Sequence, residues 1–89
     1  MSMPLRATGR RDARALAANA VNLSFLERYG TFPQPDDRLW ELDPFEKLDL
    51  VGEIELKLGA AFRDADIEFL EHPNDLIERG ASALMRARR

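Results

Sequence analysis

The chain has 89 residues, 45% of them hydrophobic, and a formal net charge of −3 at pH 7. This length suits one domain, and the apolar share is typical of a globular chain rather than a disordered one. With no cysteine and one histidine, His72, the chain lacks the residues for a disulfide framework, a thiolate zinc site, a catalytic thiol or a histidine metal cluster. It also lacks an apolar run of the roughly 18 residues that cross a bilayer, and the apolar segment of a secretory signal. We therefore expect a cytoplasmic protein without a membrane partner.

The charges are distributed unevenly along the chain. Residues 1–14 carry four arginines and one aspartate, and residues 86–89 carry three arginines, whereas residues 15–85 carry six basic and fifteen acidic residues. An acidic body repels the phosphates of nucleic acids and attracts basic patches on proteins. The distribution favours a protein partner over nucleic acid, although a high charge density also keeps a small domain in solution whatever it binds.

The first part of the chain predicts a flexible arm followed by a helix. Residues 1–9 show no apolar periodicity, so we expect a flexible basic arm ahead of a single helical domain at residues 10–89. Alanine and leucine then recur at spacings of three and four, which predicts a helix over residues 10–29. Gly30 is the residue type that ends helices in the left-handed conformation.

A long connecting loop is predicted over residues 30–44, because Pro33 and Pro35 stand too close together for a helix to pass through them. A short helical turn at residues 37–41 is compatible with the sequence. Trp40 either fastens this loop to the core or serves as an interface aromatic, and we favour the core.

The second strong helix signal starts at Asp43 and Pro44, which suit the N-cap and the first helical position. Glu46 stands three residues after Asp43, as in a capping box. Apolar residues then follow helical spacing as far as Phe62, which predicts a helix over residues 44–62.

The remaining residues predict one short helix and one long helix. Residues 63–73 leave room for a short helical turn, and a last helix begins at Pro73 or Asn74. The expected fold is all-α, a small four-helix bundle of three long helices and a short one. The core expected from the apolar stripes consists of Leu16, Leu23, Val51, Ile54, Leu58, Phe62, Leu76, Ile77 and Leu84.

The order of these helices, together with three short motifs, resembles the acyl carrier protein family. The family's Asp-Leu-Gly and Asp-Ser-Leu-Asp motifs are similar to Glu-Leu-Asp at residues 41–43 and Glu-Lys-Leu-Asp at residues 46–49. The family's entry into its last helix is similar to His-Pro-Asn-Asp-Leu-Ile at residues 72–77. The resemblance covers roughly residues 10–84 and implies an acyl-carrier-protein-like bundle whose acidic second helix is contacted by partner enzymes.

The chain departs from the family at the residue that carries the prosthetic group. Carrier proteins attach phosphopantetheine to a serine hydroxyl at the start of the second helix, and here Lys47 stands at that position. An amine cannot form the phosphodiester, and no hydroxyl residue lies between Thr31 and Ser82. We therefore expect no phosphopantetheine and no other cofactor. Lys47 is a remnant of a modification site, a contact that replaces the arm, or a surface lysine in weak ion pairs.

The partner-binding surface that the resemblance implies lies on the acidic second helix. Its expected members are Glu46, Lys47, Asp49, Leu50, Glu53 and Leu56. Leu50 and Leu56 fall off the main apolar stripe, so they either protrude toward a partner or belong to a helix that is buried on more than one face. The expected partner is a protein with a basic patch, such as an acyl-transfer or synthase enzyme.

No set of residues in the sequence indicates catalysis or metal binding. His72 precedes a proline in a predicted loop, and no carboxylate and nucleophile accompany it, so we expect an exposed and inert side chain. The acidic residues between 64 and 71 lack the central glycine and the ligand spacing of a calcium loop. We expect a non-catalytic carrier-like or protein-interaction module. The alternative is a small helical regulatory protein, unrelated to carriers, that contacts nucleic acid or a partner through its arginine-rich termini.

Overall fold

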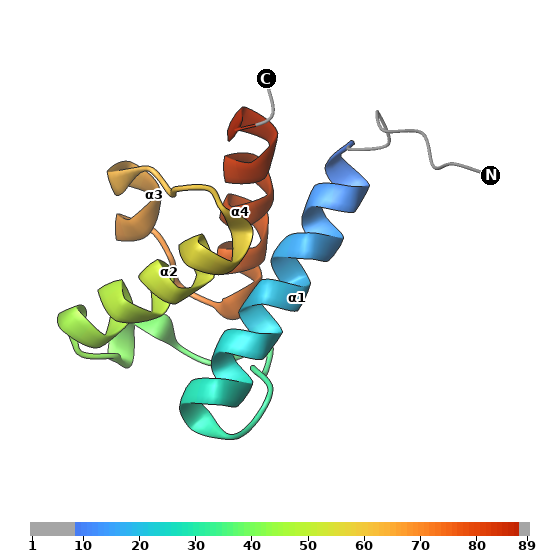
Figure 1. The fold of residues 1–89 in the computed structure, drawn as a ribbon. Coiled ribbons are helices and arrows are strands. Elements are labelled where there is room, and N and C mark those ends of the chain that lie inside the picture. The colour runs from blue at the N-terminus through green and yellow to red at the C-terminus, as the bar shows by residue number, and fades with distance from the viewer. Residues whose placement is uncertain (1–8, 88–89) are drawn as a thin grey trace.

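A computed structural model of the protein describes residues 9–87. The elements in chain order are α1 (Arg10–Tyr29), the 3-10 turn η1 (Leu39–Glu41), α2 (Pro44–Leu58), α3 (Asp64–Glu68) and α4 (Pro73–Ala87). No strand occurs within this part of the chain, so the all-α class with three long helices and a short one is confirmed (Figure 1). Residues 1–8, which make up nearly all of the predicted flexible arm at 1–9, lie outside the described residues.

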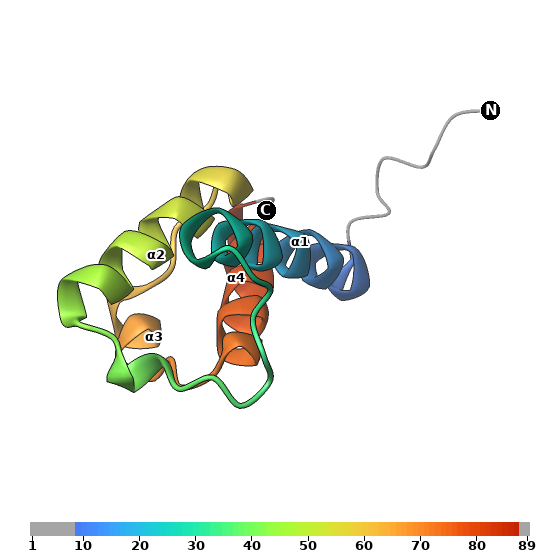
Figure 2. The ribbon, with the colours of Figure 1, turned by 90° about the horizontal axis from the view of Figure 1, so that it is seen from below.

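α1 begins and ends at the predicted residues. Gly30 adopts φ 75°, and its backbone N–H donates to the carbonyl of Leu26 at 2.9 Å. This left-handed closure is nearly free of strain only for a residue without Cβ. The loop that follows carries the chain across to η1 and α2 (Figure 2).

α2 begins as predicted but is shorter than predicted. The Asp43 carboxylate accepts a hydrogen bond from the backbone N–H of Phe45 at 2.8 Å, so Asp43 is the N-cap. The helix ends at Leu58 rather than at residue 62, because Gly59 adopts φ 67° and closes onto the carbonyl of Glu55 at 2.8 Å. Phe62 lies beyond this turn, in the connection between α2 and α3. It is buried because the chain returns to the core there, not because it belongs to α2.

α1 and α4 run in opposite directions and pack closely against each other. Arg10 lies beside Ser82, and Arg14 lies beside Asn74. α2 packs against both helices, and the short α3 lies on the same side of the molecule as α2 (Figure 1). The loop after α1 passes the start of α4, where the backbone N–H of Leu39 donates to the carbonyl of Glu71 at 2.8 Å.

The close packing of α1 on α4 depends on small side chains. Gly80 of α4 is buried, and a Cβ built on it would lie 3.2 Å from the Cβ of Ala17 and 3.1 Å from Cδ1 of Leu58. Contacts this short are tighter than ordinary van der Waals packing. The alanines of α1 therefore face α4, and the leucines of α1 lie elsewhere.

The close approach of α1 and α4 explains which residues of the expected core are buried and which are not. Val51, Ile54, Phe62, Leu76 and Leu84 are buried, and Leu58 and Ile77 are half-buried against the core clusters. Leu16 and Leu23 are exposed, so their assignment to the core is wrong. The buried side of α1 is instead formed by Ala13, Ala17, Ala20, Val21, Ser24 and Phe25. In the loop, Leu39 enters the core and its neighbour Trp40 is exposed, contrary to the core position that we favoured for Trp40.

Candidate functional site

The most exposed apolar side chains of α2 lie on one side of that helix. Phe45, Leu48 and Leu56 are 78%, 52% and 86% exposed. They recur at helical spacing with Gly52 between them, and Asp49 lies on the same side. We call Phe45, Leu48, Asp49, Gly52 and Leu56 the outer face of α2. Single exposed apolar residues are common on proteins, but a continuous row of them is typical of a contact surface.

The opposite side of α2 is buried, and it includes one of the predicted partner-binding residues. Leu50 is 1% exposed and packs in the core with Val51 and Ile54. The prediction that Leu50 contacts a partner is therefore wrong, because α2 is covered over a broad arc. Leu56 lies on the uncovered side.

Two predicted partner-binding carboxylates contact α1. Glu46 accepts a hydrogen bond from the Tyr29 hydroxyl at 2.6 Å. Its carboxylate therefore contacts α1 instead of closing the expected capping box with Asp43. Glu53 forms an ion pair with Arg28. Both carboxylates fasten α2 to the end of α1, which leaves them little freedom to meet a partner.

These contacts also change how the two α1 side chains titrate. Burial and the hydrogen bond to Glu46 raise the pKa of Tyr29 to about 12. The hydrogen bond to Glu53 raises the pKa of Arg28 above its ordinary value. The neutral phenol and the charged guanidinium are thus the forms that the fold stabilises.

Lys47 and Asp49 lie nearer to solvent. Lys47 is half-buried in the first turn of α2, where its backbone N–H donates to the carbonyl of Asp43 at 2.9 Å. Asp49 is exposed on the outer face. Within residues 9–87 neither side chain forms an ion pair, so the weak ion pairs considered for Lys47 are not seen in this part of the chain.

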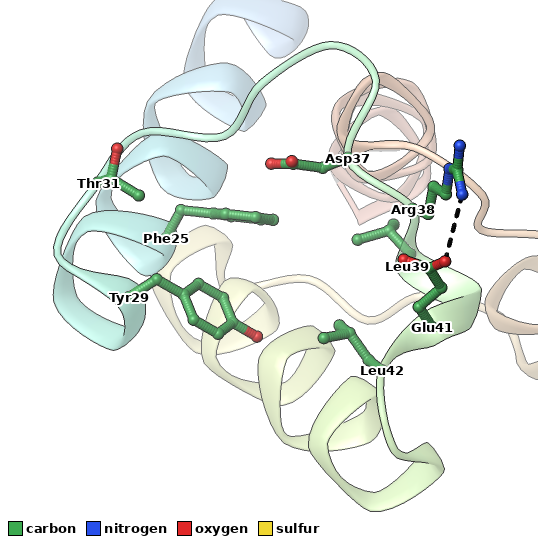
Figure 3. A pocket seen from close by; sticks show the side chains of 8 residues that line it. All are labelled: Phe25, Tyr29, Thr31, Asp37, Arg38, Leu39, Glu41 and Leu42. Carbon is green, nitrogen blue, oxygen red and sulfur yellow. Dashed lines mark hydrogen bonds and ion pairs between the residues drawn. The ribbon is translucent and has the colours of Figure 1, made fainter.

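A cavity of about 300 Å³ lies between the end of α1 and the loop that follows (Figure 3). The rings of Phe25 and Tyr29 form one wall, and Leu39 and Leu42 form the other. The lining residues are Phe25, Tyr29, Thr31, Asp37, Arg38, Leu39, Glu41 and Leu42. The polar members are engaged with their neighbours: Asp37 accepts from the backbone of Gln34 at 2.8 Å, and Arg38 pairs with Glu41 at 3.4 Å. This lining has no paired nucleophile and base.

His72 has a structural position rather than the exposed one expected. It is half-buried, and its Nδ1 donates to the carbonyl of Asp37 at 2.8 Å. Its ring meets Trp40 edge-on, with ring centroids 5.2 Å apart. His72 therefore links the loop to the start of α4.

The acidic stretch around α3 does not assemble into a metal site in the described residues. Asp66 lies 3.7 Å from Arg79 of α4, and no group of three or more histidine, cysteine, aspartate or glutamate side chains comes together anywhere in residues 9–87.

Phe45 and Leu48 are surface residues that were not expected from the sequence. Leu48 follows the helical spacing of the apolar residues of α2, so its pattern alone does not separate it from the buried side. The spacing of residues 45, 48, 52 and 56 was the available signal, because these positions share one side of a helix whose other side holds Val51 and Ile54.

Comparison of the chain with known protein families, with curated proteins and with solved structures gives no match. Across residues 9–87, no helix combines the length and the apolar character needed to cross a membrane.

Proposed function

We propose that the chain is a non-catalytic protein-interaction module of acyl-carrier-like design that binds a partner protein through the outer face of α2, without a phosphopantetheine arm. The observation that carries the proposal is the row of Phe45, Leu48 and Leu56 on a 15-residue helix whose opposite side is firmly held in the core. A rigid helix presents such side chains at fixed spacing, as helices bound in grooves do.

The size of the surface suits a reversible contact. Residues 45 to 56 rise roughly 16 Å along the helix axis, the reach of three helical turns. Full burial of a large apolar side chain contributes about 1.5–3 kcal/mol, and association itself costs a substantial part of what three such residues provide. We therefore expect a complex that forms and dissociates rather than a permanent one.

The charge around the outer face supports a basic partner. Asp49 lies within the apolar row, and Asp43 and Glu41 are exposed just before the helix. Acidic groups at the rim of an apolar contact speed association with a basic patch and reject acidic surfaces. An acyl-transfer or synthase enzyme with such a patch is the partner that the carrier-like design suggests.

Support for the carrier-like part of the proposal comes from the order and lengths of the elements. A long first helix, a long loop, a second helix opened by Asp43, a short helix and a last helix follow one another as in carrier proteins. Lys47 at the start of α2 makes the arm chemically impossible at that position.

A comparison of surface variants tests the proposal. The tagged protein, a Leu48→Ser/Leu56→Ser variant and a Leu16→Ser/Leu23→Ser control are each photo-crosslinked in cell extract, and the captured proteins are quantified by mass spectrometry. The control makes the same two leucine-to-serine changes on α1, where Leu16 and Leu23 are 45% and 39% exposed, and leaves the outer face of α2 intact. We expect capture of a basic partner by the original protein and the control, and a loss of at least about tenfold with the α2 variant.

The same capture by all three proteins would contradict the proposal. Circular dichroism of each variant shows that the fold is retained. The alternative, contact with nucleic acid through the arginine-rich termini, predicts that nucleic acid co-purifies and that the α2 variant behaves like the original protein.

A further inference from the structure

A second pocket lies at the other end of the molecule, where the start of α1 meets the end of α4. Its volume is about 330 Å³, and it is lined by Arg10, Arg63, Ser82, Met85 and Arg86. The three arginines come from three separate parts of the chain: α1, the connection between α2 and α3, and α4. No carboxylate is among the lining residues.

Neighbouring groups hold one of these arginines in place and leave the others with unused donors. Arg10 donates to Ser82 Oγ at 2.9 Å and to Glu78 at 2.9 Å. Arg86 makes one long contact, 3.4 Å, to the carbonyl of Ala61. Arg63 makes no ion pair or side-chain hydrogen bond with any of residues 9–87. Most of the guanidinium N–H groups around the pocket are thus available to a ligand.

The positive charge of this pocket is not balanced by acidic neighbours. Glu78 accepts from both Arg10 and Arg14, and these two bonds lower the pKa of Glu78 below its ordinary value. One carboxylate is therefore shared between two guanidinium groups. Neither Arg63 nor Arg86 forms an ion pair with a carboxylate of residues 9–87. The pocket stays positive although the chain as a whole carries a charge of −3.

We propose that this pocket binds the terminal phosphate of a small phosphate monoester. Guanidinium groups match phosphate oxygens in pairs, and a monoester is close to a dianion at neutral pH, which calls for more than one arginine. The Ser82 hydroxyl supplies a further polar contact. Met85 provides an apolar wall for the organic part of the ligand, and the volume lies at the lower end of small-molecule sites.

A small ligand fits this pocket better than a nucleic acid does. The site is a hollow lined by five residues, whereas residues 15–85 carry fifteen acidic residues against six basic ones and repel a long chain of phosphates. The pocket is also built from elements other than the outer face of α2, so its occupation is independent of the proposed protein contact.

The test is a titration of the labelled protein with phenyl phosphate and with inorganic phosphate at constant ionic strength, followed by the NMR signals of the arginine side chains and the Met85 methyl group. We expect saturable shifts at Arg63, Arg86 and Met85, with the phenyl ester binding more tightly than inorganic phosphate. Arg63→Gln and Arg86→Gln should each weaken binding by about tenfold or more, the typical loss of a charged hydrogen bond. Arg38→Gln is the control, because Arg38 is an exposed arginine paired with Glu41 in the loop.

Two kinds of result would overturn the proposal. The first is a sign of diffuse anion attraction alone, seen either as no saturation at about 10 mM phenyl phosphate or as equal weakening by Arg38→Gln. The second is tighter binding of a short single-stranded oligonucleotide than of phenyl phosphate, with a steep dependence on salt. That outcome would assign the arginines to a nucleic-acid contact instead.

Discussion

A pair of glycine substitutions tests whether the close approach of α1 and α4 is what the fold depends on. Gly52 and Gly80 both lie inside helices, α2 and α4. A Cβ at Gly52 would meet no atom within 4 Å, whereas a Cβ at Gly80 would meet Ala17 Cβ at 3.2 Å and Leu58 Cδ1 at 3.1 Å. Replacing each glycine by alanine adds the same methyl group, once where there is open space and once where the helices are closely packed.

The structure sets the expected size and sign of each effect. Alanine in a helix interior is favoured over glycine by about 1 kcal/mol, so Gly52→Ala should raise the free energy of unfolding by that amount. At Gly80 the same gain is opposed by overpacking, which costs about 1–3 kcal/mol in a close-packed interior. The end of the Leu58 side chain can move, but the Cβ of Ala17 moves only if α1 itself shifts. We expect Gly80→Ala to lower the free energy of unfolding by about 1 kcal/mol, a difference of about 2 kcal/mol between the two variants.

Urea denaturation followed by circular dichroism measures both values. Thermal unfolding should agree, since about 1 kcal/mol moves the midpoint by about 4–8 °C in a domain of this size. If Gly80→Ala stabilises the protein as much as Gly52→Ala does, α4 does not approach α1 and Leu58 as described. A double variant of Gly80→Ala with Ala17→Gly, which removes the opposing Cβ, should recover part of the loss attributed to packing.

Three further predictions concern α2 and its contacts. Tyr29 is the one tyrosine of the chain, so absorbance at 295 nm should report its titration alone, with a midpoint at about 12 instead of about 10. Because the folded state holds the phenol proton more tightly than the unfolded state does, the free energy of unfolding should fall as the pH rises from about 10 toward about 12. Tyr29→Phe should remove this fall. A midpoint near 10 in the folded protein would contradict both the burial of the Tyr29 phenol and its hydrogen bond to Glu46. Ile54→Ala should cost about 2–5 kcal/mol by urea denaturation because it empties the core, and Leu56→Ala should stay within about 0.5 kcal/mol, so equal losses would refute the assignment of the two sides of α2. Incubation with a phosphopantetheinyl transferase and coenzyme A should leave the mass unchanged, and a gain of one phosphopantetheine would contradict the role given to Lys47.

The sequence was sufficient to predict the helices, because their ends carry local signals. Gly30 and Asp43 determine the end of α1 and the start of α2 through their own backbone and side-chain preferences. The end of α2 was misjudged because Phe62 continues the apolar spacing while belonging to the next segment. Gly59 carries the same signal for a helix end as Gly30, but the apolar spacing that continues to Phe62 favoured the longer helix.

Which side of each helix is buried was harder to predict than the helices themselves. On α1, Leu16 and Leu23 are more hydrophobic than Ala13 and Ala17, yet the alanines are buried because α4 comes too close for leucine. The interhelical distance depends on Gly80, which lies far away in the sequence. The outer face of α2 was only partly predicted for the same reason, since the pattern of the helix alone does not say how wide an arc its neighbours cover.

The contacts of Glu46 and Glu53 have a consequence for α2 as a whole. These carboxylates stand two helical turns apart on one flank of α2, and they meet the adjacent residues Tyr29 and Arg28. Two such fixed points act together with the apolar packing of Leu50, Val51 and Ile54 to set the rotation of the helix about its own axis. The direction in which Leu56 points is thus determined partly at the end of α1. We expect a substitution at residue 28 or 29 to change the direction of the outer face of α2 without touching any residue on it.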